Sequence, residues 1–321
     1  YVNSVGKSST KRQVLMYENG RLDIEMDDIV YSLNEVVVSA ERGSNLRRTT
    51  MGVEKISVQT IRQAPSILGE ADVVKVVLTL PGVQAVSEAS SGFNVRGGAT
   101  DQNLVLFNDA TVFNPSHFFG FFSGFNPDVV SNVELYKSSI PAKYGGRLSS
   151  VLDISAKSGN KNKFSGAGGI SLLTGRLMLE GPIGAHTTFV VGGRSTYSDW
   201  LLDLIPDDKY KNSSAGFFDG NVLINTQLTE KDAIQLMGYY SQDRFSLSTD
   251  TTYNYYNQNF NLKWNRIHSG NLYSTLTIGY DSFGNGIDGR GNELYGFDRD
   301  FGMQQVFGRI DFSHRLNQKH N

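Results

Sequence analysis

The sequence predicts a mixed α/β domain followed by the strands of a transmembrane antiparallel β-barrel. The 321 residues exceed one typical domain. Glycine is abundant (34) and proline scarce (7), while tyrosine (15) and phenylalanine (19) are plentiful, which suits sheets with many turns. From Phe164 onward, apolar and polar residues alternate repeatedly with a period of two. Such alternation predicts strands that turn one apolar face and one polar face to different surroundings.

The N-terminal half lacks this regular alternation. Residues 1–32 carry short apolar runs around the turn Glu18-Asn19-Gly20 and predict a hairpin. Residues 45–158 have the composition of a mixed α/β domain. Within it, residues 67–80 predict a short helix that Pro81 ends. Strands are expected at 93–96, 103–107, 133–136 and 151–154, with a turn at Gly97-Gly98 after the first of them.

The alternating half predicts about eight strands between residues 164 and 316. In the clearest run, Tyr256, Phe260, Leu262 and Trp264 share a face opposite Asn257, Asn259, Asn261, Lys263 and Asn265. Runs of about ten residues that alternate in this way are typical of a transmembrane barrel. A soluble antiparallel sheet with one wet face alternates likewise. Connection lengths favour the barrel, because short links (181–187, 229–232, 268–271) alternate with long polar ones (204–216, 246–254, 284–302).

Several function classes find no support in the sequence. A net charge of −2 provides no basic field for nucleic acid. Cysteine is absent, and the five histidines show no metal-ligand spacing. Gly6-Lys7-Ser8 lacks the earlier glycine of a phosphate-binding loop, and no GxSxG motif occurs. We therefore expect no enzyme: no catalytic residue, no cofactor and no metal site.

An ordered set of short motifs resembles the TonB-dependent outer-membrane receptors, in particular those of Bacteroidetes. The set comprises Glu35–Ala40 (EVVVSA), similar to a TonB box; Leu80–Val83 (LPGV); Val95–Gly97 (VRG); Val105–Asp109 (VLFND); Val133–Lys137 (VELYK); and Pro141–Gly146 (PAKYGG). Ala110 stands where the family usually has glycine, and Lys137-Ser138 where it has Arg-Gly. Each motif alone is weak, whereas their order followed by barrel-like alternation is specific.

This resemblance implies an α+β plug domain inside a transmembrane antiparallel β-barrel in the outer membrane of a Gram-negative bacterium. The expected division is 1–32, the tail of an immunoglobulin-like regulatory domain; 33–44, the TonB-box-like segment and linker; 45–158, the plug; and 159–321, the first barrel strands. Eight strands enclose no room for a domain, so we expect about 22 in a longer protein. The chain begins at Tyr1 and is expected to be a processed or partial product.

The implied function is TonB-dependent import of an unidentified ligand by displacement of the plug. TonB would bind Glu35, Val36, Val37, Val38, Ser39 and Ala40 by strand addition. A strand of the preceding domain is the other interpretation of this run. A plugged barrel that serves as a structural subunit of a larger complex, and a soluble β-rich binding domain, are the alternative functions. The box reads VVVSAER rather than VVVGYG, which argues against the starch-receptor branch with its lipoprotein lid.

Two groups of site residues follow from the same resemblance. Arg96, Glu134, Lys137 and Arg147 are expected to pair with wall residues such as Arg309 or Asp311, or else to be hydrated charges. The aromatic run at 118–122 either contacts ligand or forms a core helix. The candidate ligand-binding residues are Asn114, His117, Phe118, Phe119, Tyr253 and Tyr295. Expected partners are TonB, outer-membrane lipid, and a surface lipoprotein or other outer-membrane subunits.

Overall fold

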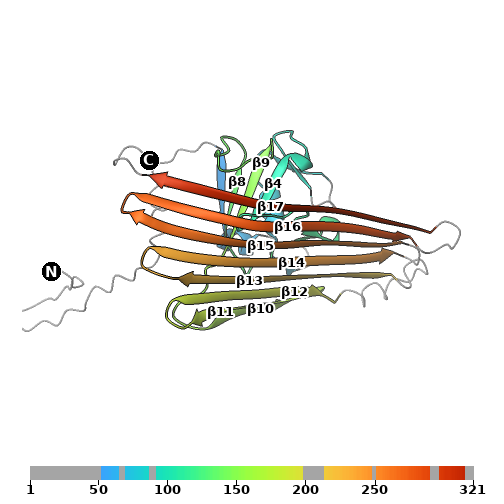
Figure 1. Cartoon of the computed structure of the whole chain (residues 1–321). Coiled ribbons are helices and arrows are strands. Elements are labelled where there is room, and N and C mark those ends of the chain that lie inside the picture. Colours follow the sequence, from blue (N-terminus) through green and yellow to red (C-terminus); the bar gives the residue numbers. More distant parts are fainter. Residues whose placement is uncertain are drawn as a thin grey trace, which may run out of the picture. The chain divides into compact units, whose positions relative to one another are not determined.

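The computed structural model describes residues 52–64, 69–86, 92–197, 213–247, 251–289 and 296–314. The hairpin predicted at 1–32 and the segment at 33–44, with the TonB-box-like residues, lie outside these described residues. Figure 1 shows two sheets, one of short strands and one of long antiparallel strands. No helix in the described part of the chain is both long and apolar enough to cross a membrane.

The first sheet belongs to an α+β domain that contains β1 to β9. Its strands are β1 (Val53–Ser57), β2 (Val83–Ala85), β3 (Phe93–Val95), β4 (Asn103–Phe107), β5 (Ala110–Thr111), β6 (Ser116–His117), β7 (Phe122–Ser123), β8 (Val130–Tyr136) and β9 (Ser150–Ala156). Five of them form a sheet in the order β1-β8-β9-β4-β5, in which only β4 and β9 run parallel. β2–β3 and β6–β7 form two small hairpins.

The helices of this domain are short and begin at side-chain caps. α2 (Val58–Gln63) follows Ser57, whose hydroxyl accepts a hydrogen bond from the Thr60 amide. α3 (Val73–Leu78) follows Asp72, which accepts from the Lys75 amide. The helix predicted before Pro81 is confirmed as α3, and its valines Val73 and Val77 are fully buried in the core. 3₁₀ turns occupy η2 (Thr100–Gln102) and η3 (Phe118–Gly120).

The second sheet, called the wall below, is a meander of eight antiparallel strands. They are β10 (Ser165–Ile170), β11 (Thr174–Ile183), β12 (Thr187–Thr196), β13 (Ser214–Gln227), β14 (Asp232–Leu247), β15 (Thr251–Ser269), β16 (Leu272–Gly289) and β17 (Phe297–His314). The predicted number of strands is thus confirmed. Within the described residues, β10 and β17 are the two ends of the order and do not pair with each other, so the wall is not a small closed cylinder.

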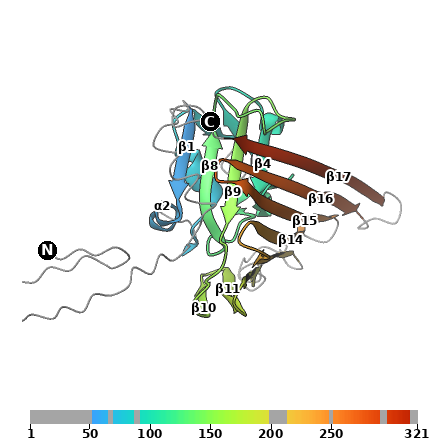
Figure 2. The ribbon, with the colours of Figure 1, turned by 60° about the vertical axis from the view of Figure 1, so that its left-hand side comes forward.

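The α+β domain packs against one face of the wall. Figure 2 shows β4, β8 and β9 beside the ribbons of β14 to β17. One core cluster contains valines and phenylalanines of the domain together with Met178, Val190, Leu223, Met237 and Tyr239 of the wall. The face of the wall that packs against the domain is called the lumen face. On the other face Phe218, Val222, Phe260, Ile278 and Val306 are exposed.

The alternation predicted for the wall is confirmed, but two predicted loops, 246–254 and 284–302, are mostly strand. Asn257, Asn259 and Asn261 are buried on the lumen face, while Phe260 between them is exposed on the other. Residues 246–254 were expected to form a long loop, yet β14 continues to Leu247 and β15 begins at Thr251. The outer face of both strands changes from apolar to polar near Gln242 and Gln258, although the backbone pairing continues beyond these residues. The polar composition of this stretch therefore marks the ends of two strands rather than a loop.

Candidate functional site

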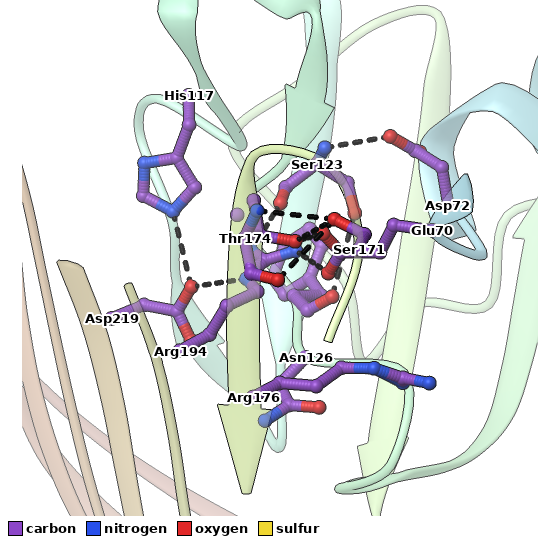
Figure 3. Close-up of polar contacts among 12 residues, drawn as sticks. Glu70, Asp72, His117, Ser123, Asn126, Ser171, Thr174, Arg176, Arg194 and Asp219 are labelled. Carbon is purple, nitrogen blue, oxygen red and sulfur yellow. Dashed lines mark hydrogen bonds and ion pairs between the residues drawn. The ribbon is translucent and has the colours of Figure 1, made fainter. Parts of the chain in front are cut away.

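One contact between domain and wall centres on Arg194 of β12. Its guanidinium donates to Glu70 of the domain (Nη1–Oε1 2.7 Å), to the Ser123 carbonyl (Nη2–O 2.6 Å) and to Asp219 of β13 (Nε–Oδ2 2.7 Å). Arg194 is 2% exposed and Glu70 4%. Charged hydrogen bonds of this kind are short and strong, and each charge depends on the others for its solvation. We call Glu70, Arg194 and Asp219 the charged clasp (Figure 3).

Further hydrogen bonds hold the groups of the clasp in place. The Thr174 hydroxyl of β11 donates to Glu70 Oε2 at 2.6 Å. Ser123, whose carbonyl meets Arg194, donates its amide to Asp72 at 2.7 Å, and Asp72 also caps α3. Burial raises the pKa of Asp72 and outweighs its two amide hydrogen bonds. The clasp therefore connects α3 and the β6–β7 hairpin with three wall strands.

His117 extends the network to β14. Its Nδ1 lies 2.6 Å from Asp243 Oδ2 and its Nε2 3.3 Å from Asp219 Oδ2, and its ring stacks on Phe217 at 4.1 Å between centroids. Burial works to lower the pKa of His117, but the carboxylates of Asp243 and Asp219 outweigh it, and the pKa is raised. The protonated imidazole donates a hydrogen bond from Nδ1 to Asp243, and its charge attracts Asp219 on the other side of the ring.

A second contact joins the turn after β4 to β14–β17. Asn108 and Asp109 both have positive φ (53° and 74°), a conformation that asparagine and aspartate tolerate better than most residues. Asp109 pairs with Lys263 of β15 and with Arg309 of β17, the latter at 2.8 Å. Burial works to raise the pKa of Asp109, but these two cations lower it well below its ordinary value.

Of the four residues predicted to connect plug and barrel, those with a side-chain partner in the structure find it within the α+β domain. Glu134 pairs with Lys55 at 2.7 Å and Lys137 with Glu54 at 3.0 Å, all within the α+β domain. Arg147 donates to the adjacent Gly146 carbonyl, and Arg96 is exposed at a turn with φ 51°. The predicted wall residue Arg309 does bind the domain, but at Asp109. Because Glu134 and Lys137 lie on β8 or next to it, the neighbouring edge strand β1 supplies their counter-charges.

The candidate ligand-binding residues are divided between the domain–wall contact and the open lumen face. Asn114 exchanges two hydrogen bonds with Asn257, and the Phe118 amide donates to Asp243 at 3.1 Å. Tyr253 packs against Phe245 with centroids 6.3 Å apart, on the lumen face of β15. The Phe119 side chain and Tyr295 lie outside the part of the chain that the structure describes. The aromatic run does not form a core helix, since positive φ at Phe118 and Gly120 breaks it into a 3₁₀ turn.

Glu70, Arg194 and Asp219 were not singled out as site residues. Alternation along residues 214–227 puts Asp219 on a polar strand face, and the same reasoning extended to Thr187–Thr196 puts Arg194 on the face in register with it. Glu70 carries no such signal, because it lies in an irregular segment before α3. Among the described residues, no group of histidine, aspartate and glutamate is arranged to hold a metal ion.

A comparison with protein families matches residues 45–150 to the model described as the TonB-dependent receptor plug domain. No curated protein sequence matches the chain. Solved structures share the fold. A siderophore receptor, PirA of Acinetobacter baumannii, aligns with a TM-score of 0.59 at 16% identity over 81% of this chain and 44% of its own.

Two further structures align in the same way. The ferric enterobactin receptor PfeA of Pseudomonas aeruginosa, in a G324V mutant, has a TM-score of 0.59 at 16% identity, over 82% of this chain and 46% of its own. The copper transporter OprC has a TM-score of 0.61 at 11% identity, over 83% of this chain and 44% of its own. The chain therefore spans about half the length of the solved structures that it matches.

Proposed function

We propose, from the premise that this chain belongs to the TonB-dependent receptors, that it imports a ligand across the outer membrane by displacement of its plug. The protein is located in the bacterial outer membrane, where the exposed apolar face of the wall meets lipid. From here on, the α+β domain is called the plug. The observation that carries the proposal is the charged clasp, which holds the plug on the lumen face through buried yet separable contacts.

The arrangement of the plug sheet gives a direction to the displacement. β1 is an edge strand in the order β1-β8-β9-β4-β5, and its residues Val53–Ser57 pair only with β8 within the described sheet. It is also the first described strand that follows the TonB-box-like residues 35–40 in the sequence. A pull on that side loads β1 first, and an edge strand can separate from its single neighbour one residue pair at a time. Its ion pairs Lys55–Glu134 and Glu54–Lys137 would break in the same step.

The ligand is proposed to bind on the side of the plug where β14–β17 extend furthest. The lumen face there carries Tyr253 and Phe245, and Asn114 lies on the adjacent plug segment. The solved structures that share the fold include receptors for siderophores and a copper transporter. Iron-loaded siderophores and copper are therefore the first ligands to test for this protein.

The import mechanism can be tested in the full-length receptor, in cells that depend on it for a ferric siderophore. Replacement of residues 35–40 by a glycine–serine segment of equal length should abolish uptake of radioactive iron and leave siderophore binding to the cell surface unchanged. The same replacement at residues 5–10 is the matched control and should retain uptake. Unimpaired uptake after replacement of 35–40 would refute energised import through this segment.

A further inference from the structure

One tyrosine on the outer face of the wall lies over a glycine of the neighbouring strand. Tyr256 of β15 is paired with Gly284 of β16. The Tyr256 atoms Cε1, Cζ and the hydroxyl oxygen all come within 2.9 Å of the point that a Cβ of Gly284 would occupy. One side of the ring therefore rests on β16, and the other side faces away from the wall. A ring held in this way is an apolar platform on an otherwise polar surface.

Side-chain amides lie next to this platform. Gln242 of β14 is the cross-strand neighbour of Tyr256 on its other side, and its Nε2 donates to Asn254 Oδ1 at 3.2 Å. The Tyr240 hydroxyl donates to Gln242 Oε1 at 3.3 Å. A side-chain amide has two donor hydrogens and two acceptor lone pairs, so these bonds orient the amides and leave further donors and acceptors for a ligand. We call Tyr240, Gln242, Asn254 and Tyr256 the amide–tyrosine patch.

The patch lies just beyond the part of the wall that meets lipid. On β15 the outer face is apolar up to Phe260, and Tyr256 stands two outer positions further, about 13 Å along the strand. Barrel strands are tilted by about 35–45°, so the platform stands roughly 10 Å above Phe260. The polar layer on one side of a bilayer is about 5–8 Å thick. In the outer leaflet of this membrane, the sugars of lipopolysaccharide occupy the level of the patch.

The charges around the patch disfavour recognition of a phosphate group. Within the described parts of β13–β17, the outer face beyond the apolar band carries one cation, Arg244, against the three carboxylates of Asp288, Asp298 and Asp300. Phosphate is bound by arginine and lysine side chains, and a surface with excess negative charge repels it. A neutral sugar meets no such repulsion. Its C–H groups pack on an aromatic face, and its hydroxyls exchange hydrogen bonds with amides.

We infer that the amide–tyrosine patch binds the neutral sugar units of lipopolysaccharide in the outer leaflet. One sugar ring stacks on Tyr256, and its hydroxyls bond to Gln242 and Asn254. A single platform holds few rings, so each contact is weak and exchanges quickly. The contact fixes the depth of the receptor in the membrane from the sugar layer, as the apolar band does from the hydrocarbon. The inference rests on the proposed function only for the orientation, with the long ends of β14–β17 outward.

Saturation-transfer NMR of the purified full-length receptor in phospholipid nanodiscs tests this without TonB or an imported ligand. The probe is the core oligosaccharide of lipopolysaccharide from the producing cells, freed of its lipid and its phosphate groups. Saturation of the receptor should pass to the ring C–H protons of this probe. Absence of transfer, or transfer only to an oligosaccharide that keeps its phosphate groups, would overturn the inference.

Variants show whether the patch is the site. Tyr256→Leu keeps Gly284 covered but removes the aromatic face, and should weaken binding of the probe about fivefold. Gln242→Leu keeps the ring, should also weaken binding, and serves as the test if Tyr256→Leu does not fold. Tyr280→Leu is the matched control, because Tyr280 lies on the same face within the apolar band, paired with Phe260. Wild-type affinity in both patch variants would refute the site. Failure of TonB-driven uptake alone would affect only the proposed function.

Discussion

Arg194 and His117 illustrate how single side chains determine the strength of the plug–wall contact. Both are buried, and both bridge Asp219 to another acidic residue, Glu70 or Asp243. A buried charge left without its partner is far more costly than an exposed one. The contact is therefore stable while complete and weak once one member is lost.

Arg194→Ala should destabilise the seated plug by about 3–5 kcal/mol, because Glu70 and Asp219 would remain buried without their cation. Amide hydrogen exchange of residues 116–128 in the full-length receptor measures this as faster local opening. Arg266→Ala, which removes an exposed ion pair with Asp232, is the control and should leave that exchange unchanged. Equal exchange in the two variants would contradict the role given to the clasp.

His117 should make plug seating depend on pH. Its pKa is raised in the folded protein, so its stabilising contribution is complete below the unfolded value of about 6.5 and is lost as pH rises through the folded value. Limited proteolysis of the plug, wild type against His117→Gln at the same pH, measures this. The wild type should be more resistant at pH 6, and the difference should shrink in alkaline buffer. A difference that grows with pH would reverse the assignment.

Alternation in the sequence was sufficient to place Asn259 and Asn261 on one polar face, since each strand has only two faces. It could not predict which plug group each would meet. Arg309 was assigned to the contact, but its partner Asp109 depends on two consecutive positive-φ residues that re-aim the chain after β4. Pairings between distant segments arise from backbone geometry that local sequence patterns do not encode.

At the scale of elements, the wall strands were recognised but their lengths were underestimated. Expected loops at 246–254 and 284–302 are largely the ends of β14 to β17, because polar residues continue the ladder beyond the apolar band. The aromatic run 118–122 was assigned to a helix or a ligand surface. It forms a turn between β6 and β7 rather than a helix, and Phe118 and Phe122 pack on Phe217. That packing is a tertiary contact and leaves no periodic signal. The ligand contact stays a prediction.

A glycine on β12 allows the plug to approach the wall closely. A Cβ at Gly192 would lie 2.5 Å from Val129 Cγ2 of the plug, well inside contact distance. Gly192→Leu should therefore displace the plug and cost about 1–3 kcal/mol of seating free energy, measured by hydrogen exchange of residues 126–133. Gly238→Leu on β14 is the matched control, since no atom lies within 4 Å of its added Cβ. Undisturbed exchange in Gly192→Leu would show that the plug does not sit against this strand.

At the scale of the whole molecule, the wall is taller than a membrane requires. β15 has 19 residues, whereas about 9–11 span the hydrocarbon. Its outer face is apolar at Phe260, Leu262 and Trp264, and polar from Gln258 towards Thr251. The surplus of about eight residues corresponds to roughly 25 Å of strand, and its polar part extends beyond the lipid on that side. The projecting end is the one expected to face the extracellular medium.

Surface labelling checks this placement. In intact cells that express the full-length receptor, Gln258→Cys and Asn254→Cys should react with a bulky maleimide that does not cross the outer membrane. Phe260→Cys, on the same face of the same strand, should remain unlabelled because lipid covers it. Labelling of Phe260→Cys to the same extent would place the apolar band outside the membrane.

The contacts of the plug described above all reach strands between β11 and β17, the part of the wall synthesised directly after it. The domain and this part of the wall form one compact unit. Each covers apolar surface that the other would leave exposed, so the folding of one can guide the folding of the other during synthesis.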